Sequence, residues 1–162
     1  MRVHVCKIIC SIAAVALWWP TAQAEFFEIE RYDVTVTVDK ESVLHVEEVI
    51  DVAFTAPRHG IFRKIPYEYR SVESDLSFRT LLYDVSVPDE QFSVSRSDGY
   101  VTIRIGDPNQ NVSGKRRYII KYNVFGGVKF KENFDELYWN VIGHDWDVGI
   151  QKARFKVELP PI

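Results

Sequence analysis

"LHVEEVIDVAF" (residues 44–54) is the stretch that decides the fold of this 162-residue chain. Apolar side chains occupy every second position from Leu44 to Phe54, interrupted only by Glu48, and the other face carries mainly polar or small residues. A period of two is the signature of a β-strand with one face in a hydrophobic core. The stretch therefore predicts a long, half-buried strand.

The same alternation recurs on both sides of this stretch. Turn sequences rich in glycine, aspartate and asparagine separate the alternating runs, and no run after the first 24 residues has a helical period. Regularly spaced short strands with polar turns predict an all-β fold, a single antiparallel β-sandwich that is immunoglobulin-like in general architecture. The residues expected to face the core are Tyr32, Val34, Val36 and Val38; Val101, Ile103 and Ile105; Tyr118, Ile120, Tyr122 and Val124; and Ala153, Phe155, Val157 and Leu159.

Glu48 is the one residue that conflicts with this pattern, because its parity places it on the inward face. An isolated buried carboxylate is strongly disfavoured and needs a partner. Arg58 or Arg63 could supply it, since a guanidinium offers a two-pronged fork to a carboxylate. Alternatively, a β-bulge near Glu47 reverses the parity and places Glu48 in water. We predict a structural ion pair of Glu48 with Arg63.

Residues 1–24 have the pattern of a secretory signal peptide. Arg2 and Lys7 precede an apolar run, and a small-x-small sequence ends at Ala24, so cleavage is expected before Glu25. An uncleaved anchor is the alternative, but the apolar run of about a dozen residues is shorter than the roughly 20 needed to span a bilayer. We expect export across the cytoplasmic membrane, to the periplasm or cell surface.

The remaining residues, 25–162, are long enough for one extracytoplasmic domain. They contain no cysteine, because Cys6 and Cys10 both lie in the predicted signal peptide, so no disulfide can stabilise the domain. Loss of Arg2 and Lys7 changes the net charge from −3 to −5. This negative balance argues against nucleic acid as a partner.

The segment "PRHGIFRKIPYEYR" (57–70) is the first candidate site. Arg58, His59 and Arg63 could bind an anion or a peptide carboxylate. Alternatively, the segment is a loop pinned by its apolar side chains, with Arg63 neutralising Glu48. No nucleophile and no carboxylate stands beside His59 in the sequence, so the segment does not predict catalysis.

The segment "DELYWNVIGHDWDV" (135–148) is the second candidate site. Ordinary core packing explains its large aromatic residues, but they could also stack on sugar rings beside carboxylates. The candidate binding residues are Trp139, His144, Asp145 and Trp146, and the candidate catalytic carboxylates are Asp135, Glu136, Asp145 and Asp147.

Metal and cofactor chemistry is not predicted. After residue 24 the histidines are His45, His59 and His144, which are far apart in sequence and have no ligand-like spacing. We therefore expect neither a metal site nor a cofactor.

Three elements together carry a family resemblance: the strand with Glu48, the segment "HGIFRKIP" (59–66) and the segment "ELYWNVIGHDWDV" (136–148). In this order and spacing the chain, from about Glu28 to Pro160, resembles the exported N-terminal domain of a bacterial membrane-protein family known as domain of unknown function 2207. The resemblance implies a β-sandwich held outside the membrane and followed by transmembrane helices, a region we expect to be absent from this chain. The family brings no established activity.

The sequence thus predicts a non-enzymatic extracytoplasmic domain that binds a protein or cell-envelope partner and, through the family's membrane region, acts at a membrane. The competing hypothesis is a cell-envelope glycan hydrolase that uses paired carboxylates in residues 135–147.

Overall fold

The computed structural model of the chain describes residues 26–70, 77–143 and 145–160. Within these ranges every regular element is a β-strand, and there is no helix. The predicted signal peptide (1–24) and His144 lie outside the described residues. The strands are β1 (Phe27–Val38), β2 (Leu44–Arg58), β3 (Ile61–Pro66), β4 (Glu68–Arg70), β5 (Ser77–Arg79), β6 (Leu81–Ser86), β7 (Phe92–Ser97), β8 (Tyr100–Ile105), β9 (Val112–Phe125), β10 (Val128–Phe130), β11 (Asp135–Leu137) and β12 (Ala153–Glu158).

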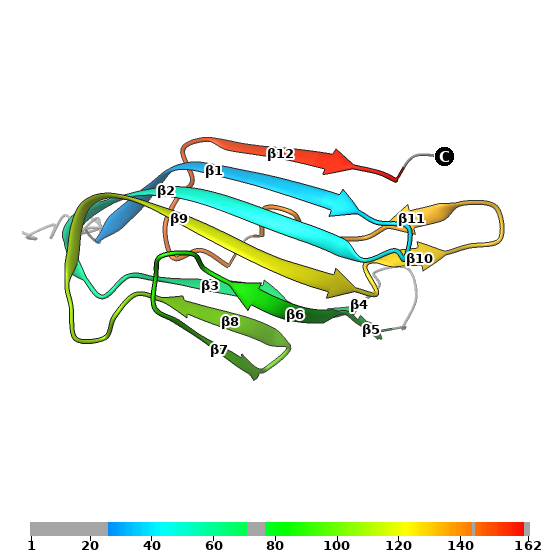
Figure 1. Cartoon of the computed structure of the whole chain (residues 1–162), viewed down its shortest axis with the longest axis horizontal. Helices are drawn as coiled ribbons and strands as arrows, with labels where there is room; N and C mark the ends of the chain where they lie inside the picture. Colours follow the sequence, from blue (N-terminus) through cyan, green and yellow to red (C-terminus); the bar gives the residue numbers. More distant parts are fainter. Residues whose placement is uncertain (1–25, 71–76, 144, 161–162) are drawn as a thin grey trace, which may run out of the picture.

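The largest sheet has five strands in the order β12-β1-β2-β9-β6 (Figure 1). β2 pairs antiparallel with β1 and β9, and β6 pairs antiparallel with β9. The β1–β12 pair is parallel, which corrects the prediction of a wholly antiparallel fold. Parallel neighbours need a long connection rather than a hairpin. Here residues 138–152 return the chain to the start of β1, where Ile150 bridges Ile29.

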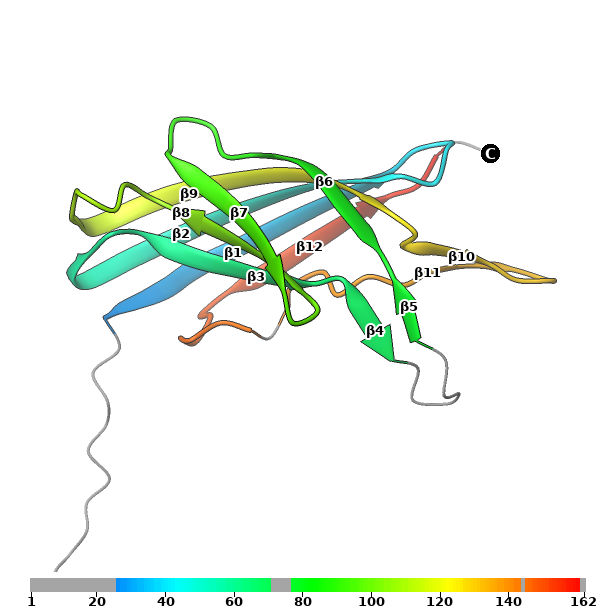
Figure 2. The same ribbon diagram turned by 90° about the horizontal axis from the view of Figure 1, so that it is seen from below.

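A second, antiparallel sheet of order β3-β8-β7 lies along one face of the five-stranded sheet (Figures 1 and 2). Buried apolar side chains of both sheets form one core cluster, which includes Ile50 and Ile120 of the larger sheet and Ile65 and Ile103 of the smaller one. None of the sheets among the described strands closes on itself.

The inward faces predicted from alternation are buried in most strands. β2 buries every second residue from Leu44 to Phe54, Glu48 included. The register of β2 against both neighbours runs without a shift through Glu47 and Glu48, so the β-bulge alternative is wrong. The sequence pattern therefore does place a carboxylate inside the protein.

β12 is the exception to this agreement. Phe155, Val157 and Leu159 alternate as predicted, but all of them are exposed. Phe155 and Val157 are register partners of the buried Val34 and Val36 and so share their face of the sheet. β12 is the outermost strand, and no described residue buries its apolar face.

Two short hairpins, β4–β5 and β10–β11, contact each other through aromatic side chains. Tyr69 stacks on Phe78 with 5.1 Å between the ring centroids, and Tyr138 meets Phe78 edge-on at 5.1 Å. The ammonium of Lys129 lies 3.1 Å from the centre of the Phe78 ring. Cation–π and aromatic contacts of this kind hold the hairpins together.

Candidate functional site

Glu48 and Arg63 form a two-pronged ion pair inside the core. Nε of Arg63 donates to Oε2 of Glu48 at 2.8 Å, and Nη2 donates to Oε1 at 2.9 Å. Glu48 is 0 % exposed and Arg63 is 1 % exposed. The pair joins the two sheets, because Glu48 lies on β2 and Arg63 on β3. Arg63, and not Arg58, is therefore the partner of the buried carboxylate.

The remaining polar atoms of the pair also have partners. The Tyr122 hydroxyl donates to Oε1 of Glu48 at 2.6 Å, and Nη1 of Arg63 donates to the carbonyl oxygen of Lys64 at 2.7 Å. Burial is the largest single influence on Arg63 and lowers its pKa. The charge of Glu48, its hydrogen bonds with Arg63 and the nearby Tyr32 and Tyr122 together outweigh burial, so the pKa of Arg63 is raised. Burial, followed by the charge of Glu48, raises the pKa of Tyr122 well above its usual value. The cluster is a satisfied, charge-assisted network.

Residues of the second candidate segment (135–148) pack against the buried Arg63 of the first candidate segment (57–70). The guanidinium carbon of Arg63 lies 5.5 Å from the Trp146 ring centroid and 5.8 Å from that of Tyr32. Gly143 packs so closely that a Cβ there would lie 2.8 Å from Nη1 of Arg63. Trp139 contacts the ring of Tyr122, with 6.3 Å between the centroids. Trp139, Gly143 and Trp146 thus pack over the ion-pair cluster.

Arg58 and His59 face a different part of the molecule from Arg63. They line a pocket of about 430 Å³ with Phe26, Phe62 and Arg104, and Arg63 is not part of its lining. The pocket lies where β2 passes into β3 and where β8 ends. The predicted group of Arg58, His59 and Arg63 is therefore not assembled at one site.

One lining residue of this pocket, Gly60, packs closely against a second glycine, Gly106. Gly60 and Gly106 have φ angles of +116° and +119°, values that side chains other than glycine rarely adopt. A Cβ on Gly60 would lie 1.9 Å from the carbonyl oxygen of Ile105, and a Cβ on Gly106 would lie 2.1 Å from that of His59. This close approach of the two backbones places His59 beside the end of β8.

The positive charges of this pocket have no carboxylate partner in the part of the chain that the structure describes. Its lining contains no aspartate or glutamate. Among the described residues, neither Arg58 nor Arg104 forms an ion pair. The guanidinium of Arg58 lies 5.4 Å from the ring centres of Phe26 and Phe27, and that of Arg104 lies 5.9 Å from that of Phe62. The pocket therefore combines fixed positive charge with aromatic walls.

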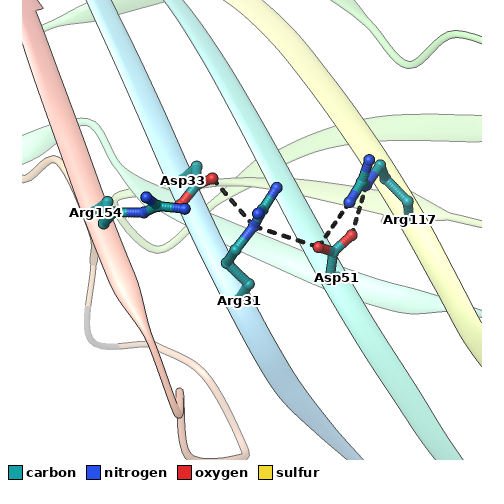
Figure 3. Close-up of polar contacts among 5 residues, drawn as sticks. All are labelled: Arg31, Asp33, Asp51, Arg117 and Arg154. Carbon is teal, nitrogen blue, oxygen red and sulfur yellow. Dashed lines mark hydrogen bonds and ion pairs between the residues drawn. The ribbon is translucent and has the colours of Figure 1, made fainter.

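The outer face of the five-stranded sheet shows the opposite situation. Arg117 donates to both carboxylate oxygens of Asp51, at 2.6 and 2.9 Å, and Arg31 lies between Asp51 and Asp33 (Figure 3). Arg154 of β12 contacts Asp33 at 3.3 Å. The hydrogen bond from Arg117 is the main cause of the lowered pKa of Asp51. Here each arginine is already neutralised by a neighbouring strand, so this face is a solvated ion-pair network.

The carboxylates of the second segment do not all gather at one place. Asp145, Trp146 and Asp147 line a pocket of about 400 Å³ with Tyr100, whose hydroxyl donates to Asp145 at 3.4 Å. The negative charge of Asp145 is the main reason why the pKa of Tyr100 is raised. Asp135 and Glu136 lie instead on β11 and are not among the residues lining that pocket.

Arg104, Phe26 and Phe62 are pocket residues that the sequence reasoning missed. Arg104 alternates with Ile103 and Ile105 on β8, which predicts that it points away from the core, but no local signal predicts that β8 ends beside Arg58. Phe26 lies directly after the predicted signal peptide and precedes the first alternating run. The pairing of β3 with β8 sets Phe62 opposite Arg104. Phe26 is held near the end of β2, because its carbonyl oxygen accepts hydrogen bonds from the amides of Thr55 and Ala56.

Neither a metal centre nor a membrane helix is found in the part of the chain that the structure describes. Its histidines, aspartates and glutamates form no group of three that could hold a metal ion. Residues 26–70, 77–143 and 145–160 also contain no helix long and apolar enough to cross a membrane.

These features define an all-β domain in which a buried ion pair joins two sheets and leaves a basic pocket at one end. The chain belongs to the family described as predicted membrane protein (DUF2207) N-terminal domain, whose model matches residues 28–161. It is 27% identical over 145 residues to the uncharacterized protein YciQ of Escherichia coli (strain K12). This alignment covers 83% of the present chain and 22% of YciQ. The chain therefore spans about a fifth of the length of this relative.

Solved structures show only distant likeness. A two-domain M1 zinc metallopeptidase bound to L-tryptophan aligns with 65% of this chain and 22% of its own, at 11% identity and a TM-score of 0.40. Leukotriene A4 hydrolase from Saccharomyces cerevisiae aligns with 60% of this chain and 15% of its own, at 10% identity and a TM-score of 0.39. Likeness at this level says nothing about the activity of this chain.

Proposed function

We propose that this chain is a non-enzymatic, extracytoplasmic binding domain of a membrane-protein family, and that it binds an anionic ligand in the pocket of Arg58 and Arg104. The observation that carries the proposal is a pair of arginines that line one pocket without an ion-pair partner among the described residues. In a chain with a net charge of −3, several other arginines, among them Arg31 and Arg117, are paired with carboxylates. Two that are left unpaired side by side favour an external anion.

The shape and chemistry of the pocket narrow the ligand class. Its volume of about 430 Å³ lies within the usual range for small-ligand sites, roughly 300–1,000 Å³. Guanidinium groups bind carboxylate or phosphate oxygens in a two-pronged geometry. Phe26 and Phe62 supply apolar walls and are about half exposed. A carboxylate or phosphate attached to an apolar group, as at a peptide C-terminus, satisfies both features.

The cellular setting of this proposal rests on the family and on the N-terminal sequence. The signal-peptide pattern of residues 1–24 supports export. Membership of a predicted membrane-protein family supports action at a membrane, beside the parts of the relative that this chain does not span. We propose that the two layers of sheet act as a rigid β-sandwich that presents the pocket to a protein or cell-envelope partner.

Titration with a matched pair of small molecules tests the binding function. Phenylacetate carries a ring and a carboxylate, whereas phenylacetamide has the same shape without the charge. We expect phenylacetate to shift the NMR signals of His59 and of the Arg58 and Arg104 side-chain N–H groups, and phenylacetamide to leave them in place. Arg58→Gln and Arg104→Gln should each weaken phenylacetate binding, by about tenfold for the loss of one charge-assisted contact. Equal shifts with both compounds, or none with either, contradict an anion site.

The glycan hydrolase remains the second candidate because Asp145 and Asp147 line one pocket with Trp146 and Tyr100. Most glycoside hydrolases use a pair of carboxylates, and aromatic rings can stack on the sugar. Incubation of the purified chain with cell-wall polysaccharide decides between the two functions. Release of soluble sugars that is abolished in Asp145→Asn and Asp147→Asn, while Arg104→Gln retains it, would establish the hydrolase and refute the non-enzymatic proposal.

A further inference from the structure

β12 has one edge with which no described strand pairs. It is the first strand in the order β12-β1-β2-β9-β6, and Figure 1 shows it at the side of the molecule opposite the three-stranded sheet. Sheet edges with free backbone groups are sites at which another strand can pair. A protein that leaves such an edge open usually blunts it, or uses it for assembly.

The direction of the free backbone groups follows from the parallel pairing with β1. Tyr32 is the register partner of Ala153, and the Tyr32 amide donates to the carbonyl oxygen of Lys152 at 2.9 Å. In a parallel ladder, a residue forms its hydrogen bonds with the two residues that flank its register partner on the neighbouring strand. For Tyr32 of β1 these flanking residues are Lys152 and Arg154. The amide and carbonyl groups of Lys152, Arg154 and Lys156 therefore face β1. Those of Phe155 and Val157 face the open edge.

The same odd-numbered residues carry exposed apolar side chains. The exposed fractions are 65 % for Phe155, 36 % for Val157 and 70 % for Leu159. Their face of the strand is the core face of the sheet, as the register partners Val34 and Val36 show. The edge thus offers main-chain hydrogen bonds and apolar area together, which is the combination used in strand addition.

We propose that a second copy of this chain pairs with β12, antiparallel about a two-fold axis through Val157, so that the two five-stranded sheets become continuous. A two-fold interface must be self-complementary. In this register Val157 faces its own copy and Phe155 faces Leu159 of the second copy, all at hydrogen-bonded positions. Lys156 faces Glu158 of the second copy on the opposite side of the sheet, so both charges are matched.

The sequence of β12 favours this register over its neighbour. Pairing centred on Lys156 would place the two Lys156 ammonium groups opposite each other, at a position where side chains approach most closely. Pairing centred on Val157 avoids that repulsion. It also places Pro160 opposite Arg154 at a non-hydrogen-bonded position, where the missing N–H of proline is not needed.

Charge exchange at Lys156 and Glu158 tests both the dimer and its register. Sedimentation equilibrium of the purified chain should show a concentration-dependent dimer. Lys156→Glu and Glu158→Lys should each weaken it by about tenfold or more, because each turns two opposite-charge contacts into like-charge contacts. The double variant restores opposite charges across the axis, so its dimerisation constant should return to within about threefold of wild type.

An apolar substitution with a matched control completes the test. Phe155→Ser should also weaken the dimer, whereas Phe130→Ser, at a residue with 71 % exposure on β10, should not. Circular dichroism of each variant verifies that it is folded. A chain that stays monomeric at all concentrations overturns the proposal. So does a dimer that Phe155→Ser leaves unchanged, or one that the double charge exchange does not restore.

Discussion

Replacing Arg63 by methionine should destabilise the protein more than any substitution at its surface. The change leaves the Glu48 carboxylate, which is 0 % exposed, with only the Tyr122 hydroxyl of the three donors it has now. Breaking a buried ion pair from one side typically costs about 3–5 kcal/mol, because a charge remains buried without compensation. For a domain of this size, we expect the melting temperature to fall by roughly 10–20 °C.

The double variant Glu48→Leu/Arg63→Met separates the unpaired charge from the loss of the pair itself. Apolar replacements of a buried ion pair are often neutral or stabilising. Here they leave the Tyr122 hydroxyl without its acceptor, a cost of about 1–3 kcal/mol. The double variant should therefore be more stable than Arg63→Met, and adding Tyr122→Phe should recover part of the remaining loss.

Urea and thermal unfolding measured by circular dichroism provide the free energies. Arg58→Ala is the matched control, because Arg58 belongs to the same segment but has no ion pair among the described residues. Its guanidinium lies over the exposed ring of Phe26 and the buried ring of Phe27, so the substitution should cost less than about 1 kcal/mol. Arg63→Met with the stability of wild type would refute the argument, and so would a double variant less stable than Arg63→Met alone.

Two further predictions concern Gly143, beside the buried ion pair, and His45 on the exposed face of β2. Gly143→Ala should destabilise by about 1–3 kcal/mol more than Gly114→Ala in urea unfolding, because both glycines have positive φ but only at Gly143 would the added Cβ press on Arg63. Equal losses would show that no such contact exists. For His45, the hydrogen bond that its ring Nε2 donates to the Asp39 carboxylate raises the pKa above the ordinary value. Because the pKa of His45 is raised in the folded state, the stabilisation from its pairing with Asp39 is complete below the unfolded-state pKa of about 6.5. This stabilisation is lost as the pH rises through the folded-state pKa. An NMR titration should show the raised pKa, and Asp39→Asn should return it toward the ordinary value; an unchanged pKa would contradict the pairing.

The sequence predicts the interior of this protein better than its surfaces. The parity of Glu48 identifies a buried carboxylate, because the burial of alternate residues in β2 is a local property of the strand. The same reasoning fails for β12, where Phe155 alternates correctly but is exposed. Alternation shows which side chains share a face, but whether another layer covers that face depends on the order of strands in the sheet.

The pocket of Arg58 and Arg104 could not be predicted from local sequence patterns, for a related reason. The two arginines are 46 positions apart, and they meet only because β3 pairs with β8 in the register that sets Ile61 opposite Ile105. Their unpaired state is also invisible in the sequence, since it depends on which carboxylates other strands bring near. Composition alone would predict that arginines in an acidic chain find partners.

Residues 58–63 are contiguous in the sequence but contribute to two separate sites, the basic pocket and the buried ion pair. Gly60 turns the chain sharply between them: on one side Arg58 and His59 line the basic pocket, and on the other Arg63 points into the core. The buried pair fixes β3 against β2, and β3 in turn fixes β8, which carries Arg104. If this chain of contacts positions the pocket, the double variant Glu48→Leu/Arg63→Met should weaken phenylacetate binding even where the protein remains folded, although neither residue lines the pocket. Titration of that variant, with unfolding curves measured on the same samples, checks the coupling. Unchanged affinity would mean that apolar packing between the sheets is sufficient to hold the pocket in place.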